Sequence, residues 1–372
     1  MKKHSSKRQT ARARIDARET GTTVGLDIGD AHIHVAVLNQ NGELIWEGRI
    51  RTREVELRRW LAELPTSVVA LETGPHSRWI AAAARQCGHD VIVANVRRVR
   101  LIYGGEIKTD QLDAEKLARL ARADRKLLFP IEHRPEKEHA DLAVIAAREA
   151  LVKMRTEAIN MVRGVVKAAG ARVADCAAEA FTGRANEVLP ALLRNALGPI
   201  LEEIDGLNER IREYDEGIEH LARTEYPETE LLTQVAGVGT LSALTFRLTI
   251  GSGERFSRSR DVGGYVGLRP KRDQSGERDP DLGITKAGNP RLRRTLVNCA
   301  HYILGPFGPD CDLRRWGLEL ARAGNRKGAK KRAIVAVARK LAVLLHRLLV
   351  SGEVYEPLRN SRGIPGKAVT AA

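Results

Sequence analysis

The chain has 372 residues, which is long enough for two or three domains that each bury a hydrophobic core. Hydrophobic residues make up 43% of it and charged residues 29%, a balance that excludes a disordered or a membrane-embedded chain. Lys and Arg exceed Asp and Glu by 62 to 47, so the net charge of +15 predicts a polyanionic partner such as nucleic acid. Only 4% of residues are aromatic, which argues against recognition mainly by stacking of unpaired bases.

The basic residues and the cysteines indicate where the protein works. Residues 1–20 are rich in Lys and Arg without an apolar run, which predicts a basic, disordered arm and not a secretory signal. The four cysteines form no CxxC pair, so neither a zinc ribbon nor a disulfide framework is predicted. The most apolar stretch, 333–350, is interrupted by charges and predicts a packed helix. We therefore expect a cytoplasmic, nucleoid-associated protein without a membrane contact.

The N-terminal part alternates between strand and helix patterns. Three short strand patterns lie between Thr23 and Ile50, with an Asn41-Gly42 turn signal between the second and the third. A helix over about 54–64, a strand at 67–72, a helix over about 76–86, a strand at 90–96 and a helix from about 110 follow. The order βββαβαβα predicts an α/β layered domain over residues 21–130 and is the element order of the ribonuclease H superfold.

The middle part, residues 131–228, begins with a polar linker and then becomes helical. Apolar residues recur every seven positions from Ile145 to Val166, and again at alternating spacings of four and three from Ile200 to Leu221. This pattern predicts a helical coiled-coil segment, either a hairpin within the chain or a contact between two copies. An ordinary amphipathic helix packed on its own domain is the alternative.

The C-terminal part, residues 229–350, is predicted to be mostly helical and is followed by a tail at 351–372. Gly237 and Gly239 lie in a turn between two helix patterns, where backbone N–H groups could bind a DNA phosphate, although a plain packing turn is as good an interpretation. A helix beginning near Pro290 and a basic block at 314–347 provide further cations. Candidate nucleic-acid contacts in these two segments are Arg291, Arg293, Arg294, Lys330, Lys331 and Arg332.

Four carboxylates carry the predicted chemistry. Asp27 ends the first strand and Glu72 ends the fourth, and these strands are neighbours in a ribonuclease H-like sheet. Asp110 and Asp113 lie three apart at a helix start and share a face, although each could instead be a helix cap or a solvated acid. Four ionised carboxylates together require a cation. Two Mg²⁺ ions would satisfy that charge and could stabilise both oxygens of an in-line phosphoryl transfer.

The motifs together resemble a known family. GLDIGDAHIHVAVLN, ALETGPHS, KTDQLDAEKLARL, VAGVGTLSAL, GGYVGLRPKRDQSG and ITKAGNPRLRRTL are similar, in this order, to those of the DEDD transposases of bacterial insertion-sequence family one-ten. The resemblance covers residues 21–350. It implies a RuvC-like domain with Asp27, Glu72, Asp110 and Asp113 as metal ligands, and a C-terminal transposase domain with Ser275 as the catalytic serine. It also implies guidance by an element-encoded bridge RNA.

We therefore expect an α/β plus all-α enzyme that cuts and rejoins double-stranded DNA by metal-assisted phosphoryl transfer, as a dimer or tetramer. A RuvC-like junction-resolving endonuclease without strand rejoining is one alternative, because hydrolysis needs only metal-bound water. A non-catalytic nucleic-acid-binding protein is another. An actin-like ATPase or sugar kinase also opens with Asp-x-Gly on a hairpin, but the second glycine-rich phosphate loop that it needs does not appear.

Overall fold

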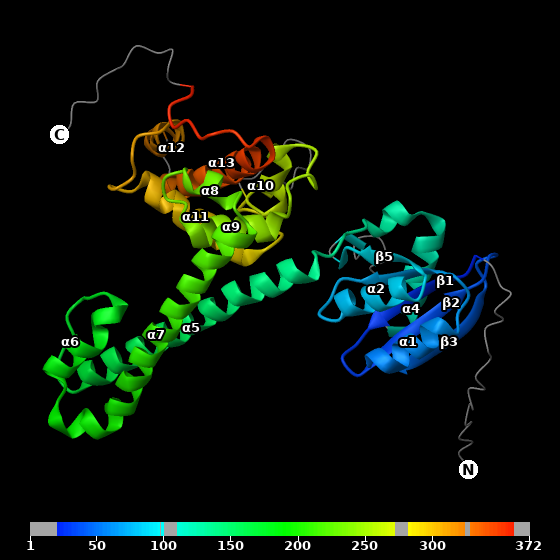
Figure 1. The fold of residues 1–372 in the computed structure, drawn as a ribbon, viewed down its shortest axis with the longest axis horizontal. Coiled ribbons are helices and arrows are strands. Elements are labelled where there is room, and N and C mark those ends of the chain that lie inside the picture. The colour runs from blue at the N-terminus through cyan, green and yellow to red at the C-terminus, as the bar shows by residue number, and fades with distance from the viewer. Residues whose placement is uncertain (1–20, 97, 100–109, 272–281, 324–327, 361–372) are drawn as a thin grey trace. The chain divides into compact units, whose positions relative to one another are not determined.

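The computed structural model describes residues 21–96, 98–99, 110–271, 282–323 and 328–360 (Figure 1). The predicted N-terminal arm, residues 1–20, lies outside the described residues, as does the part of the tail from 361 onward. The chain divides into two compact units, residues 1–133 and residues 134–372. Each unit is considered by itself below.

The first unit is an α/β domain built on one mixed sheet. Its strands are β1 (Thr23–Ile28), β2 (His32–Leu38), β3 (Leu44–Arg51), β4 (Val68–Glu72) and β5 (Asp90–Ala94), in the order β3-β2-β1-β4-β5. Its helices are α1 (Glu54–Ala62), α2 (Ser77–Gln86), α4 (Asp110–Ala123) and the short η1 (Arg125–Leu128). β1 pairs antiparallel with β2 and parallel with β4. The predicted element order and the pairing of the first with the fourth strand are confirmed.

The two faces of the sheet follow from the alternation of side chains along each strand. Val24 and Leu26 of β1 belong to the cluster that includes Leu57 of α1 and Ile80 of α2. On the opposite face, Ala70 of β4 packs in a second cluster with residues of α4. Asp27 and Glu72 occupy the positions in register with that second face, so the strand period directs both carboxylates toward the side of the sheet that α4 covers.

The second unit begins with a long helical hairpin. Its elements are α5 (Glu136–Ala168), η2 (Ala178–Ala180), α6 (Phe181–Val188), η3 (Ala191–Leu193) and α7 (Arg194–Glu225). The apolar seam of α7 packs against α5 of the same chain, and Ile204 is fully buried without any second copy. Of the two coiled-coil interpretations, the hairpin within the chain is the one observed. The contact between two copies through this seam is wrong, because the partner side chains on α5 already cover it.

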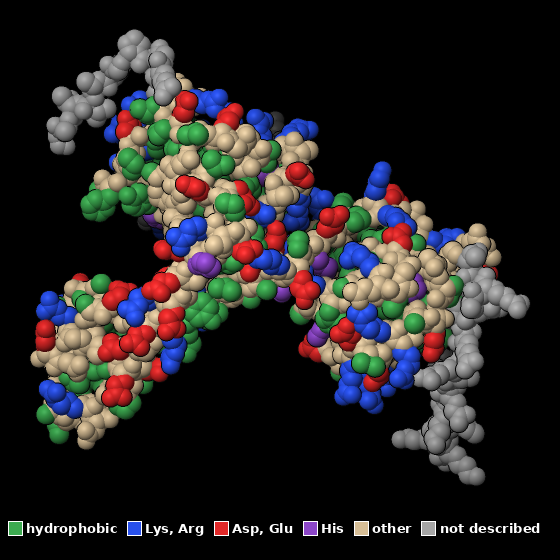
Figure 2. All heavy atoms as spheres, in the orientation of Figure 1, with side chains coloured by type: hydrophobic (Ala, Val, Ile, Leu, Met, Phe, Trp, Pro, Cys, Tyr) green, Lys and Arg blue, Asp and Glu red, His purple; other side chains and the backbone are tan. Residues whose placement is uncertain are grey.

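The middle of this hairpin is polar. Arg148 of α5 pairs with Asp215 of α7 through two hydrogen bonds, and Arg155 of α5 donates to Asn208 of α7 at 2.7 Å. Apolar clusters lie toward both ends of the hairpin, one around Val162 and one around Ile218. The outer surface of the hairpin carries acidic and basic side chains side by side (Figure 2).

The remaining helices form the C-terminal core. They are α8 (Thr229–Thr233), α9 (Thr240–Ile250), η4 (Ser259–Asp261), α10 (Val262–Tyr265), α11 (Pro290–Leu304), α12 (Asp312–Ala323) and α13 (Ala329–Ser351). Phe246 of α9, Leu296 of α11 and Leu341 of α13 belong to one buried cluster. The apolar stretch at 333–350 is thus a packed helix, as predicted. Within the described residues, no helix is long and apolar enough to span a bilayer.

Candidate active site

The sheet brings Asp27 and Glu72 to one end of neighbouring strands. β1 and β4 run parallel with Leu26 opposite Leu71, so the next residue along each strand is a carboxylate. Both side chains are half-buried. Parallel neighbours end at the same edge of a sheet, and this topology places two acidic groups together that are 45 positions apart in the sequence.

Gly25 brings the other two carboxylates near them. A Cβ atom at Gly25 would lie 1.9 Å from the carbonyl oxygen of Ala114 and 2.8 Å from the amide nitrogen of Ala118, both in the backbone of α4. The helix can cross β1 this closely only because Gly25 has no side chain. Asp110 and Asp113 occupy the first turn of that helix and therefore lie over the end of β1.

The four carboxylates interact electrostatically in the described structure. The pKa of Asp27 rises from 3.8 to about 6, first because the group is partly buried and then because Asp110, Asp113 and Glu72 add negative charge nearby. Lys116 partly offsets this charge, with its Nζ 3.6 Å from the Oδ1 of Asp113. Within the described residues, no three acidic, His or Cys side chains already have the spacing of metal ligands. The donor set suits a hard divalent cation, which would have to draw the carboxylates closer together.

Ser275, the serine selected by resemblance, lies outside the described residues. The chain on both sides of it is described. Pro270 and Ile284 form an isolated antiparallel β-bridge, and the amide of Lys271 donates to the carbonyl of Gly283 at 2.9 Å. The segment that carries Ser275 therefore starts and ends at adjacent points on the surface of the C-terminal core.

The predicted turn between α8 and α9 is present, and its first glycine serves packing. Gly237 has a φ of +82°, which favours glycine, and a Cβ there would lie 2.8 Å from the ring of Tyr302. Gly239 is the N-cap residue of α9, and a Cβ there would meet nothing within 4 Å. Of the two, only Gly239 leaves room for a ligand to approach the backbone.

The arginines at the start of α11 have partners within the chain. Arg291 and Arg294 both form ion pairs with Glu149 of α5. Arg293 donates to the carbonyl oxygens of Val266 and Ala287, at 3.0 and 2.8 Å. These three side chains tie α11 to α5 and to the loop before it, so their predicted role as phosphate ligands competes with structural contacts that the sequence did not reveal.

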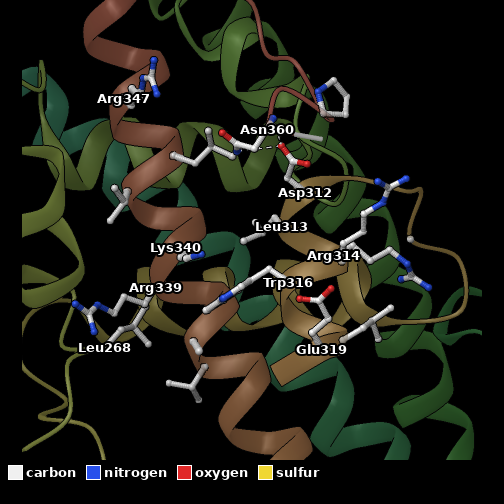
Figure 3. A pocket seen from close by; sticks show the side chains of 18 of the residues that line it. Leu268, Asp312, Leu313, Arg314, Trp316, Glu319, Arg339, Lys340, Arg347 and Asn360 are labelled. Atoms are coloured by element: carbon white, nitrogen blue, oxygen red, sulfur yellow. Dashed lines mark hydrogen bonds between the residues drawn. The ribbon is translucent and has the colours of Figure 1, made fainter. Parts of the chain in front are cut away.

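A broad groove lies beside the C-terminal half of the basic block, with a volume of about 2560 Å³. We call it the α12–α13 groove, since these two helices provide most of its lining (Figure 3). Of the predicted contacts, Lys331 and Arg332 line it, whereas Lys330 is exposed outside the lining. The side chains of Lys340 and Trp316 lie against each other between the two helices, with the Lys340 Nζ 3.6 Å from the centre of the Trp316 ring.

Comparison with known proteins agrees with this architecture. Residues 24–170 match a family described as transposase under the name DEDD_Tnp_IS110, and residues 229–309 match the transposase IS116/IS110/IS902 family. The chain is 29% identical over 288 residues to the transposase for insertion sequence element IS1328 of Yersinia enterocolitica, covering 76% of this chain and 84% of that protein. It is 26% identical over 344 residues to the transposase for insertion sequence element IS1111A of Coxiella burnetii, covering 89% and 90%.

The two matches occur in the order expected from the motifs and together cover more than half of the chain. The first spans the sheet, α4 and the whole of α5, and the second spans α8 to α11. From the sheet order, the grouped carboxylates and these matches, we conclude that the chain is a member of the IS110 family of DEDD transposases.

Proposed function

We propose that the protein cuts and rejoins DNA strands of an insertion sequence by metal-assisted phosphoryl transfer, with Ser275 as the nucleophile. The observation that carries this proposal is the group of four carboxylates around Asp27, whose mutual repulsion raises the pKa of that side chain to about 6. An isolated enzyme site gains nothing from such repulsion unless a cation relieves it.

Asp27, Glu72, Asp110 and Asp113 would hold the cation, for which Mg²⁺ is the expected identity. When bound, two such ions supply Lewis acidity to the phosphoryl oxygens and neutralise the charge that develops on them. Asp27 and Glu72 are fixed by the sheet, whereas Asp110 and Asp113 belong to the first turn of α4. The strand pair would thus set the position of the site, and the helix would close it.

Ser275 would conserve the energy of the broken bond. Attack of its Oγ on a DNA phosphorus forms a phosphoserine ester and releases a strand oxygen, which takes a proton. Attack by another strand hydroxyl on that ester then forms a new phosphodiester and returns the serine. Hydrolysis at the carboxylates alone would lose the ester and leave a nuclease, which is the second candidate function.

Three further parts of the proposal concern partners and place. We propose that double-stranded DNA is the substrate and that an element-encoded guide RNA selects it, which the net charge of +15 suits. We also propose a dimer or tetramer that acts in the bacterial cytoplasm near the nucleoid. Met154 and Met161 lie one heptad apart on α5 and are 51% and 42% exposed, so they offer apolar surface for self-association.

A trapping experiment tests the serine. Labelled DNA is incubated with Mg²⁺, guide RNA and wild-type protein, with Ser275→Ala, or with Asp27→Asn, and the denatured protein is examined for attached label. The wild type should become labelled, and neither variant should. Cleavage by Ser275→Ala without a covalent adduct would establish the nuclease instead, and labelling restored by mixing the two variants would show that two subunits share the site.

A further inference from the structure

The lining of the α12–α13 groove is strongly basic. Ten Lys or Arg residues border it, against five Asp or Glu. The acidic residues are largely engaged: Asp310 pairs with Arg315, and Glu353 pairs with Arg347 and Arg359. Six cations remain for which the described residues provide no acidic partner: Arg260, Arg322, Lys331, Arg332, Arg339 and Lys340. Cations gathered on a concave surface repel one another, so this groove favours a polyanion.

The floor of the groove is apolar. Trp316 of α12 and Val335, Val343 and Leu344 of α13 are half-buried along it. Duplex DNA hides its bases and presents phosphates, whereas an unpaired strand also presents sugars and base faces that can lie on apolar side chains. Although the chain as a whole is poor in aromatic residues, this groove combines cations with an apolar floor. That combination fits one strand better than a duplex.

The position of the groove indicates which nucleic acid it holds. Pro270 and Ile284, the two residues that bridge at the ends of the segment carrying Ser275, both line it. We propose that the α12–α13 groove binds a single unpaired strand of DNA, close to the segment that carries the nucleophile. This inference rests on the proposed function, since it is Ser275 that identifies the strand as DNA rather than RNA.

Photocrosslinking tests the occupant of the groove. Benzoylphenylalanine is placed at Val343 in the groove, or at Val165 on α5 as a control of the same residue type, which is 36% exposed. Full-length Ser275→Ala protein is used, so that crosslinking does not depend on strand transfer. It is mixed with guide RNA and a branched DNA whose unpaired arm, duplex arm and RNA carry different labels.

The expected result is a crosslink from position 343 to the unpaired DNA arm and none from position 165. A crosslink only to the duplex or to the RNA, or none while the DNA remains bound, would refute the inference. In a parallel measurement, Arg332→Glu with Arg339→Glu should flatten the salt dependence of single-strand affinity by roughly 0.7 log units per lost phosphate contact. The control pair Lys153→Glu and Lys167→Glu on α5 should leave that slope unchanged.

A second and independent observation concerns His34 in the first unit. It lies on β2 directly opposite Asp27 of β1, and its Nε2 is 3.6 Å from the Oδ2 of Asp110. Its other nitrogen, Nδ1, is buried and finds no hydrogen-bond partner in the described part of the chain. The imidazole therefore reaches both the strand carboxylate and the helix carboxylate of the site.

The buried nitrogen indicates the tautomer. A proton on Nδ1 would bury an N–H group without an acceptor, whereas an unprotonated Nδ1 needs none. The proton of the neutral ring then belongs on Nε2, which faces Asp110. Histidines that bind metals normally donate their second N–H to an acceptor. Since Nδ1 has no such acceptor in the described residues, His34 does not fit the pattern of a metal ligand.

We infer that His34 is a positioning residue, whose Nε2–H holds Asp110 beside Asp27. Mn²⁺ binding by full-length protein, followed by electron paramagnetic resonance of the free ion, tests this role. His34→Leu should weaken binding roughly tenfold. His34→Gln, which keeps an N–H at the place of Nε2, should restore most of it. His32→Leu, two residues earlier on the same strand, should bind as the wild type does.

Nitrogen chemical shifts of ¹⁵N-histidine-labelled protein report the tautomer separately from any metal or activity. The Nε2–H form supports the inference, and an Nδ1–H form of His34 would overturn it. Wild-type affinity in His34→Leu, or a folded His34→Gln variant as weak as His34→Leu, would also overturn it. Should the wild type bind no Mn²⁺ at all, the proposed metal chemistry would fail, while the tautomer would still decide the contact with Asp110.

Discussion

Replacing Gly25 by Ala is expected to abolish strand cleavage and to destabilise the first unit by about 3 kcal/mol. The added Cβ would lie 1.9 Å from the carbonyl oxygen of Ala114, and a backbone atom cannot move aside as a flexible side chain can. The helix α4 must therefore shift away from β1, and it would carry Asp110 and Asp113 with it. Denaturant unfolding and a cleavage assay with Mg²⁺ measure the two effects.

Gly74 provides the matched control for this substitution. It follows Glu72 by two residues, yet a Cβ there would meet nothing within 4 Å. Gly74→Ala should therefore unfold and cleave much as the wild type does. Cleavage by Gly25→Ala at the wild-type rate would show that the close crossing of α4 over β1 does not set the positions of the carboxylates.

The Asp27→Asn variant should lose cleavage and yet be more stable than the wild type when metal is absent. Because burial and three neighbouring carboxylates raise the pKa of Asp27 from 3.8 to about 6, its ionised form is disfavoured in the folded protein. Wild-type stability should consequently fall as the pH rises from about 4 through 6, and remain lower above that range. After allowance for partial exposure, the variant should gain about 1 kcal/mol at pH 7.

Thermal unfolding in a chelating buffer between pH 4 and pH 8 measures this gain. The stability of Asp27→Asn should lack the decline that the wild type shows across this window, and added Mg²⁺ should raise the melting temperature of the wild type more than that of the variant. Asp30→Asn, at a fully exposed side chain, is the control and should change neither curve. A variant less stable than the wild type at pH 7 would contradict the electrostatic account of the site.

Local patterns in the sequence were sufficient to predict the sheet and the four carboxylates. Alternation along β1 and β4 marks the buried strands, and an acidic residue at the end of each stands out against that pattern. The close approach of α4 could have been suspected from Gly25, the residue without a side chain on the strand face that bears Asp27. His34 was missed because its significance depends on cross-strand register with Asp27, which alternation alone does not specify.

Long-range ion pairs account for most of what could not be predicted. Arg291 and Arg294 were expected to contact nucleic acid because they are clustered cations, but Glu149, more than 140 positions earlier, pairs with both. The heptad pattern of α7 predicted a partner helix without identifying it, since a seam specifies spacing and not which helix covers it. The α12–α13 groove likewise depends on how two helices and a bridged segment pack, for which the sequence offers no local signal.

The hairpin of α5 and α7 has both of its ends fastened at one side chain. Arg247 of α9 pairs with Glu138 in the first turn of α5 and with Glu228 just beyond α7, and its guanidinium lies over the ring of Tyr226. The chain thus leaves this clamp and returns to it. Family members could therefore differ by whole heptads in both helices, each changing the reach of the hairpin by roughly 10 Å, while the catalytic sheet and the C-terminal core stay as they are.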